Sequence, residues 1–166
     1  MIKGTNVSLR PIAEADVEKL YGRMMDIEGR GPWYPLSRGS LIKFRRRFEE
    51  DGRMSDGEGV LVMVDQQDRL VGTVDRNKLN GDVPDMELGY RVFDRADWGK
   101  GIASEALGLF AGWLFDTQPI NRLHLTIHVD NVGSHRVAES AASSRRERRA
   151  RRGTTRASGT ISTSTP

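Results

Sequence analysis

The sequence contains no cysteine, which excludes disulfide bonds, cysteine-ligated zinc and a thiol nucleophile. No apolar run approaches the roughly 20 residues that a membrane-spanning helix needs. The first residues, MIKGTNVSLRP, lack the apolar segment of a signal peptide. These absences predict a cytoplasmic protein with no membrane partner. The 166 residues, 37% of them hydrophobic, are enough for one domain with a buried core.

The positive charge of the chain is confined to its C-terminal end. The whole chain has a net charge of +3, yet residues 141–166 contain seven arginines and one glutamate. Residues 1–140 carry 19 basic and 22 acidic side chains, so the main body is mildly acidic. The composition therefore does not favour a nucleic acid as partner, and binding of one through the arginine-rich tail is kept as an alternative.

Hydrophobic periodicity predicts an α/β protein in which a mixed, mostly antiparallel sheet is flanked by helices. The central strands follow one another closely, as in an antiparallel meander. A glycine-rich turn opens one of the helices, and another begins with Asn131 as a candidate cap. Strands are predicted over 6–12, 59–65, 69–79, 85–93 and 121–130, and helices over 13–25 and 40–52, within 94–119, and from 131.

The glycine-rich turn, WGKGIA at 98–103, is the first feature that suggests a ligand. Small residues at a helix N-terminus let a ligand approach the backbone, and the free N–H groups there favour a phosphate. A Walker loop would need Ser or Thr after Lys100, and a Rossmann fingerprint would need glycine at Ser104. Neither nucleotide motif fits, and a pyrophosphate-bearing ligand is the expectation.

Two adjacent motifs resemble a known family. ELGYRVFDRADWGKGIASEAL followed by NRLHLTIHVDNVGSHRVAES is similar to the acyl-CoA site of the GNAT superfamily, specifically its ribosomal-protein-alanine N-acetyltransferase branch (RimJ/RimL type). The opening VSLRPIAEADVEKLY also resembles that branch, so the likeness covers residues 1–141. It implies the GNAT fold, with acetyl transfer from acetyl-CoA to an amine by direct attack on the thioester. Gly101 and Ala103 match the family's pyrophosphate loop, whereas Trp98 replaces its usual Gln or Arg.

The resemblance also implies catalytic residues. Glu87 matches a carboxylate that serves as base, and Ser134 matches a serine that protonates or orients the CoA thiolate. The simpler interpretations are an exposed strand glutamate and a polar residue in a first helical turn. The acid tyrosine of other branches would fall at Ala138 and is absent. The implied acetyl-CoA-binding residues are Val92, Trp98, Gly99, Lys100, Gly101, Ile102, Ala103 and Asn131.

The acceptor is less well specified than the cofactor. Loops 30–39 and 76–85 are expected to line the acceptor site, but they do not distinguish a protein N-terminus from a small-molecule amine. They also do not distinguish a monomer from a homodimer. His124 and His128 share one face of the predicted strand, and since further ligands are not evident, we expect no metal site.

The C-terminal tail departs from the family pattern. The family's last helix normally ends in Gly-Phe, where this chain has Ala142 and Ser143, and two more strands follow it. Loss of one G from codons for Ala-Gly-Phe-Val would give the Ala-Ala-Ser-Ser found at 141–144. Regrouping the codons of 159–166 restores an alternating strand. We hypothesise that residues from about 142 onward are translated out of frame.

This hypothesis gives a domain prediction. Residues 1–141 form a GNAT domain without its last two strands, and residues 142–166 are disordered or a frayed helical extension, because seven arginines and one isoleucine cannot form a core. The unpaired sheet edge would reduce stability and activity. A degenerate acyl-CoA-binding protein without catalysis is the alternative to an active enzyme.

Overall fold

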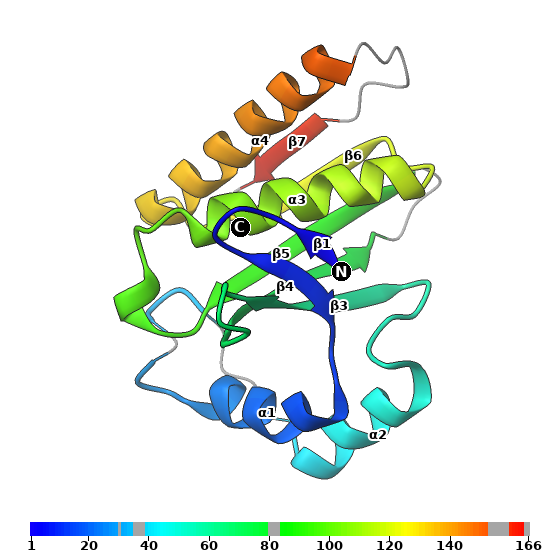
Figure 1. The fold of residues 1–166 in the computed structure, drawn as a ribbon, viewed down its shortest axis with the longest axis vertical. Helices are drawn as coiled ribbons and strands as arrows, with labels where there is room; N and C mark the ends of the chain where they lie inside the picture. The colour runs from blue at the N-terminus through cyan, green and yellow to red at the C-terminus, as the bar shows by residue number, and fades with distance from the viewer. Residues whose placement is uncertain (30, 35–38, 80–83, 153–159, 165–166) are drawn as a thin grey trace.

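The computed structural model describes residues 1–29, 31–34, 39–79, 84–152 and 160–164, except for the side chains of 144–152 and 160. The described chain folds into a seven-stranded sheet with helices on both faces (Figure 1). None of its helices combines the length and the apolar composition that crossing a bilayer requires. The elements are β1 (Ile2–Lys3), β2 (Ser8–Pro11), η1 (Glu14–Asp16), α1 (Val17–Met25), α2 (Leu41–Asp51), β3 (Glu58–Val64), β4 (Leu70–Lys78), β5 (Asp85–Val92), η2 (Arg95–Asp97), α3 (Ile102–Thr117), β6 (Arg122–Thr126), α4 (Val132–Arg152) and β7 (Thr160–Ser164).

The strands are arranged in sequence order, from β1 to β7. Neighbours from β1 to β5 are antiparallel, and the η1–α1–α2 segment lies between β2 and β3, whereas β6 is parallel to β5 and β7 is parallel to β6. Each parallel pair requires a helical crossover, which α3 and α4 provide. The predicted mixed, mostly antiparallel sheet is confirmed.

Two hydrophobic clusters hold the helices on opposite faces of the sheet. The larger cluster joins α3 and α4 to alternate residues of the strands, among them Val74 and Leu88. The smaller cluster places α1 and α2 against the other face, where Val62 and Phe93 are buried. Figure 1 shows this separation, with α3 and α4 on one side and α1 and α2 at the opposite end of the view.

Helix α3 lies between the sheet and α4, which explains why it is apolar almost all round. Phe110, Leu107 and Leu114 are fully buried, and each such side chain contributes roughly 1.5–3 kcal/mol. A Cβ on Gly108 would lie 3.9 Å from the backbone of Ala141, so small residues bring α3 and α4 close together. This packing fixes the start of both helices, where the candidate site lies.

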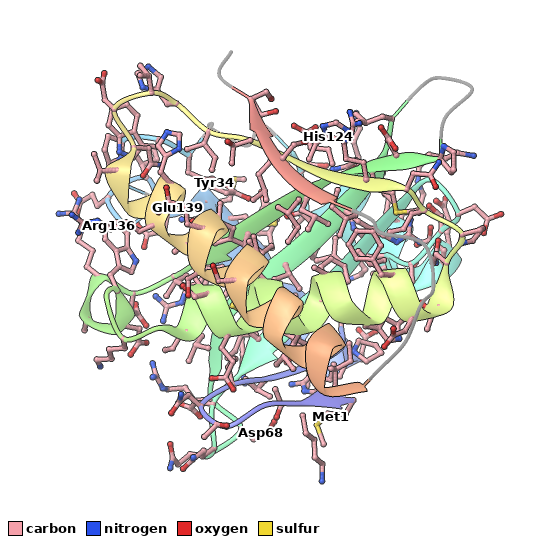
Figure 2. The ribbon with its side chains drawn as sticks, turned by 90° about the horizontal axis from the view of Figure 1, so that it is seen from above. Met1, Tyr34, Asp68, His124, Arg136 and Glu139 are labelled. Carbon is pink, nitrogen blue, oxygen red and sulfur yellow. The ribbon has the colours of Figure 1, made fainter. Side chains whose placement is uncertain are left out.

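The prediction that the sheet lacks its last two strands is wrong. Helix α4 continues to Arg152, and Thr160–Ser164 then pairs with all five residues of β6 as β7. Figure 2 labels His124 beside this strand, and its Nδ1 lies 3.0 Å from the hydroxyl of Ser162. The predicted unpaired edge on β6 is therefore covered. Part of the predicted disordered tail, residues 153–159 and 165–166, lies outside the described residues.

The composition of the whole tail concealed this strand. Its arginines precede a short segment of β-branched residues, TIST at 160–163, which has high strand propensity. An open edge presents unpaired N–H and C=O groups, so five residues are enough to extend the sheet. Ile161 also packs against the main core.

If β7 is part of the native sheet, Ile161→Ala should lower the free energy of unfolding by about 1–2 kcal/mol, since a partly buried side chain is lost. Urea denaturation measures the change. Thr163→Ala, at an exposed position on the same strand, is the matched control and should change it far less. Equal, negligible effects at both positions would show that the strand contributes nothing to stability.

Candidate functional site

The sheet opens into a fork between β5 and β6. The two strands are paired only over Asp85–Glu87 and Arg122–His124, although β5 continues for five more residues and β6 for two. Beyond these pairs the strands' facing backbone groups are not paired with each other. Parallel strands that separate at their carboxyl ends leave a crevice where ligands commonly bind in α/β sheets.

The predicted glycine-rich turn lies directly after β5 and leads into α3. Gly99 and Gly101 have φ angles of 75° and 79°, which a residue with a Cβ adopts only with strain. A Cβ on either residue would meet nothing within 4 Å, so the backbone is open on that side. The first helical bond runs from Glu105 N–H to Gly101 O, which leaves the N–H groups of 102–104 outside the helical ladder. These features fit a pyrophosphate.

Ion pairs hold the turn in place. Arg69 donates to both oxygens of buried Asp97, at 2.8 and 3.2 Å, and these bonds hold the pKa of Asp97 below its ordinary value. Lys100, a predicted cofactor residue, lies 3.3 Å from the same carboxylate through its exposed ammonium group. Glu105 accepts hydrogen bonds from the backbone N–H of Asn6, so its carboxylate holds the start of α3 to the segment between β1 and β2. The turn is therefore built before any ligand binds.

Trp98 occupies the position where the family has Gln or Arg. Its indole Nε1 donates to the carbonyl of Val92 at 3.2 Å, and Arg95 lies over the ring at 5.7 Å. Trp98 thus fastens the turn to the last residue of β5. A carbonyl oxygen has two lone pairs, so Val92 can still accept a second bond from a ligand.

Ser134 lies at the fork on the α3 and α4 side of the sheet. The hydroxyl of Tyr90, on β5, donates to Ser134 Oγ at 2.9 Å. Burial raises the pKa of Tyr90, against the opposing effect of this bond, so the phenol remains a donor. Asn131 Oδ1 accepts the Ser134 N–H at 3.1 Å and caps α4, and Ala138 is buried in the core. Because Tyr90 supplies the proton of their shared bond, the hydroxyl hydrogen of Ser134 is available to another acceptor.

Glu87 lies at the base of the fork on the opposite face. It belongs to the last pair between β5 and β6, and it accepts a hydrogen bond from Thr126 Oγ1 at 2.5 Å. His124, its partner in the pair, lies 3.1 Å from Asp85 Oδ2. The strand prediction over 121–130 is too long, because β6 ends at Thr126 and places His128 in the following loop. Among the described residues, no cluster of three or more acidic or histidine side chains could hold a metal ion.

A cavity of about 210 Å³ lies between the sheet and the α1–α2 pair, on the same face of the sheet as Glu87. Asp75 on β4 lines it, and burial, followed by the charge of Glu87, raises the pKa of Asp75 to about 6. Tyr34 and Arg91 also line the cavity, with the guanidinium 4.7 Å from the ring centroid. The lining also contains Glu58 and the guanidinium groups of Arg53 and Arg76, so the cavity presents both carboxylates and cations to a polar ligand.

The segment 31–34 lies across the mouth of the fork. The Trp33 ring stacks on His128 with centroids 4.6 Å apart, and a Cβ on Gly31 would lie 3.0 Å from Trp98. Tyr34, labelled in Figure 2, extends from the same segment to the cavity. Part of the predicted acceptor loops, residues 30, 35–38 and 80–83, lies outside the described residues.

Sequence reasoning therefore placed the cofactor turn, Glu87 and Ser134 around one fork, but missed three contributors. Tyr90 was not named as a candidate, although a tyrosine among core residues needs a partner for its hydroxyl. The sequence pattern around Thr126 did not indicate that this residue belongs to the site. Asp75 is an acid inside an apolar strand, LVGTVD, and this could have marked it as unusual.

The chain is similar to known proteins. A family model described as "Acetyltransferase (GNAT) domain" matches residues 6–142. The chain is 28% identical to a probable N-acetyltransferase, YjcK, of Bacillus subtilis (strain 168) over 155 residues, which cover 85% of this chain and 82% of that protein.

Solved structures share the fold. Spermidine N-acetyltransferase from Vibrio cholerae, in complex with CoA and spermine, has a TM-score of 0.71 at 17% identity and covers 83% of this chain and 80% of its own. A GNAT-family acetyltransferase from Bacillus anthracis has a TM-score of 0.67 at 22% identity, covering 84% and 81%. Mycobacterium smegmatis RimJ, in complex with CoA-disulfide, has a TM-score of 0.63 at 22% identity, covering 80% and 68%.

The raised pKa of Asp75 predicts a pH-dependent cost in stability. Because the folded-state pKa, about 6, exceeds the ordinary 3.8, the protonated form is favoured by folding, and stability falls as the pH rises from 4 through 6. Asp75→Asn should therefore match the wild type near pH 4 and exceed it by about 3 kcal/mol above pH 7. Urea denaturation across this range measures the difference. Glu49→Gln, an exposed control on α2, should show no such trend, and a pH-independent effect of Asp75→Asn would contradict the shift.

Proposed function

The chain belongs to the GNAT family of acetyltransferases and is an acetyl-CoA-dependent N-acetyltransferase, and we propose that its acceptor amine binds in the cavity on the α1–α2 side of the β5–β6 fork. One observation carries the proposal: the fork has the open glycine turn and Ser134 on one side, and Glu87 with the cavity that Asp75 lines on the other. A group bound across the fork would therefore meet both sets of residues.

The cofactor residues are those around the start of α3 and α4. The backbone of Gly99, Lys100, Gly101, Ile102 and Ala103 binds the pyrophosphate through N–H groups at the positive end of the helix dipole. Val92 and Asn131 border the fork and bind the arm that leads to the thioester, while Trp98 holds the turn against β5. Acetyl-CoA supplies an activated acetyl group.

The catalytic residues proposed are Glu87 and Ser134. Glu87 assists removal of a proton from the amine through water, from its position at the base of the fork. Ser134 donates its hydroxyl hydrogen toward the departing thiolate, and Tyr90 orients it by holding one lone pair of Ser134 Oγ. The Asn131 cap fixes the backbone of Ser134.

The acceptor class is a primary amine that is cationic in solution. The carboxylates of Asp75 and Glu58 line the cavity beside three arginines, and an ammonium group would pair with those carboxylates. Similarity to RimJ supports a protein N-terminus, and similarity to spermidine N-acetyltransferase supports a polyamine, so both belong in the test.

We also propose that the chain from about Ala142 is an out-of-frame reading, on the codon argument given above. Resequencing the gene without finding a single-base lesion near codon 142 would refute it.

Loss of the open glycine turn should weaken cofactor binding. Gly101→Ala places a Cβ at a φ of 79°, which costs about 1–2 kcal/mol and distorts the cradle, so the Kd for CoA should rise about tenfold. Calorimetric titration measures it. Gly57→Ala is the control, because its Cβ position is open and its φ is not left-handed. An unchanged Kd for Gly101→Ala would place the pyrophosphate elsewhere.

Thiol release should be detected when acetyl-CoA is incubated with an N-terminal alanine peptide, spermine or kanamycin. With the best of these acceptors, Ser134→Ala should lower kcat about 100-fold and Tyr90→Phe about tenfold, since one removes the proton donor and the other its orientation. Ser140→Ala, at an exposed position on α4, should retain full turnover. CoA binding without turnover of any amine would favour the degenerate, non-catalytic alternative.

A further inference from the structure

Among the described residues, none donates a hydrogen bond to Asp75 that would explain its position. It lies in the middle of β4, on the sheet face that looks into the cavity, and its pKa is governed by burial and by nearby charges rather than by a hydrogen bond from a described residue. A carboxylate that only stabilised the fold would be paired with a donor. Asp75 instead destabilises the fold when charged, which is a common property of residues retained for function.

The backbone of β5 makes room for this carboxyl group. Asp75 is paired with Gly89, and a Cβ on Gly89 would lie 2.5 and 2.7 Å from the two carboxyl oxygens. The side chain therefore extends across the strand pair, over β5. Glu87 is two residues before Gly89 on the same face, a diagonal neighbour at roughly 7–8 Å between Cα atoms. Asp75 therefore lines the cavity, Glu87 lies at the fork, and the charge of Glu87 acts on Asp75.

We propose that Asp75 is the final acceptor of the proton that the acceptor ammonium loses, with Glu87 and water passing that proton from the fork. The proposal rests on the function proposed above and names a residue that the sequence comparison did not. The ammonium nitrogen gives up a first proton, which reaches Asp75 and then returns to solvent, and the freed lone pair forms the bond to the acetyl carbon. The nitrogen then loses a second proton as the carbon–sulfur bond breaks toward sulfur, and this proton replaces the hydrogen that Ser134 gives to the thiolate.

The surroundings of Asp75 favour its protonated form. Burial is the main cause, the charges of Glu87 on β5 and Glu58 on β3 act in the same direction, and Arg53 opposes them. From the segment that covers the fork, Tyr34 faces the same carboxylate, and Arg91 on β5 lies against Tyr34. Since the pKa of Asp75 is about 6, the group is ionised at neutral pH and still basic enough to hold a proton briefly.

The pH profile of kcat/KM distinguishes the two carboxylates, because it reports the free enzyme's groups. The wild type should lose activity below about pH 6. In Asp75→Asn that acid limb should disappear, with kcat lowered at least tenfold at pH 7.5. In Glu87→Gln the limb should remain but move to lower pH, since the charge that raises the pKa of Asp75 is gone. Glu49→Gln controls for loss of a carboxylate and should leave the profile unchanged.

A second variant tests position rather than charge. Gly89→Ala should displace the flexible end of Asp75 and lower kcat/KM about tenfold, while the melting temperature and the Kd for CoA stay close to those of the wild type. The proposal fails if the acid limb persists in Asp75→Asn, or if Glu87→Gln abolishes it. Absence of turnover in the wild type with every amine would instead refute the proposed function.

Discussion

The three residue pairs that join β5 to β6 are the constraint on which the site depends. While paired, the strands bring Glu87 and Thr126 within hydrogen-bond distance, and once they separate, the two faces of the sheet become accessible to one ligand. The α3 crossover begins at the end of β5, so its open N–H groups lie at the same fork. Tyr90, on the free part of β5, reaches Ser134 only because β6 has already turned away.

Much of this could be predicted from local pattern. The alternation in DMELGYRVF assigned Glu87 to the face opposite Leu88, and the glycine turn marked the start of α3. What pattern could not give was the pairing between distant residues. Asp75 is paired with Gly89 on the neighbouring strand, and Ser134 is hydrogen-bonded to Tyr90, which is 44 positions away in the sequence. The strand Thr160–Ser164 was missed because composition was averaged over a whole tail, whereas strand pairing needs only a few suitable residues beside an open edge.

Stability and chemistry are opposed at the cavity. The fold tolerates a carboxylate whose charge is unfavourable there, and ion pairs elsewhere, such as Arg69 with Asp97, strengthen the turn that the cofactor needs. Strain at Gly99 and Gly101 is avoided by the absence of a side chain, which also leaves the backbone open. The buried Asp75 carboxylate is thus a costly feature and the open turn a permissive one, and the remaining packing supports both.

Hydrogen–deuterium exchange with and without CoA tests the central claim, that cofactor binding is organised by the β5–β6 fork. Saturating CoA should slow exchange in peptides covering 98–105 and 131–137, where the amides of α3 and α4 begin, and leave α2 unchanged. Protection confined to α1 and α2, or to the arginine-rich end of α4, with none at the fork, would contradict the account.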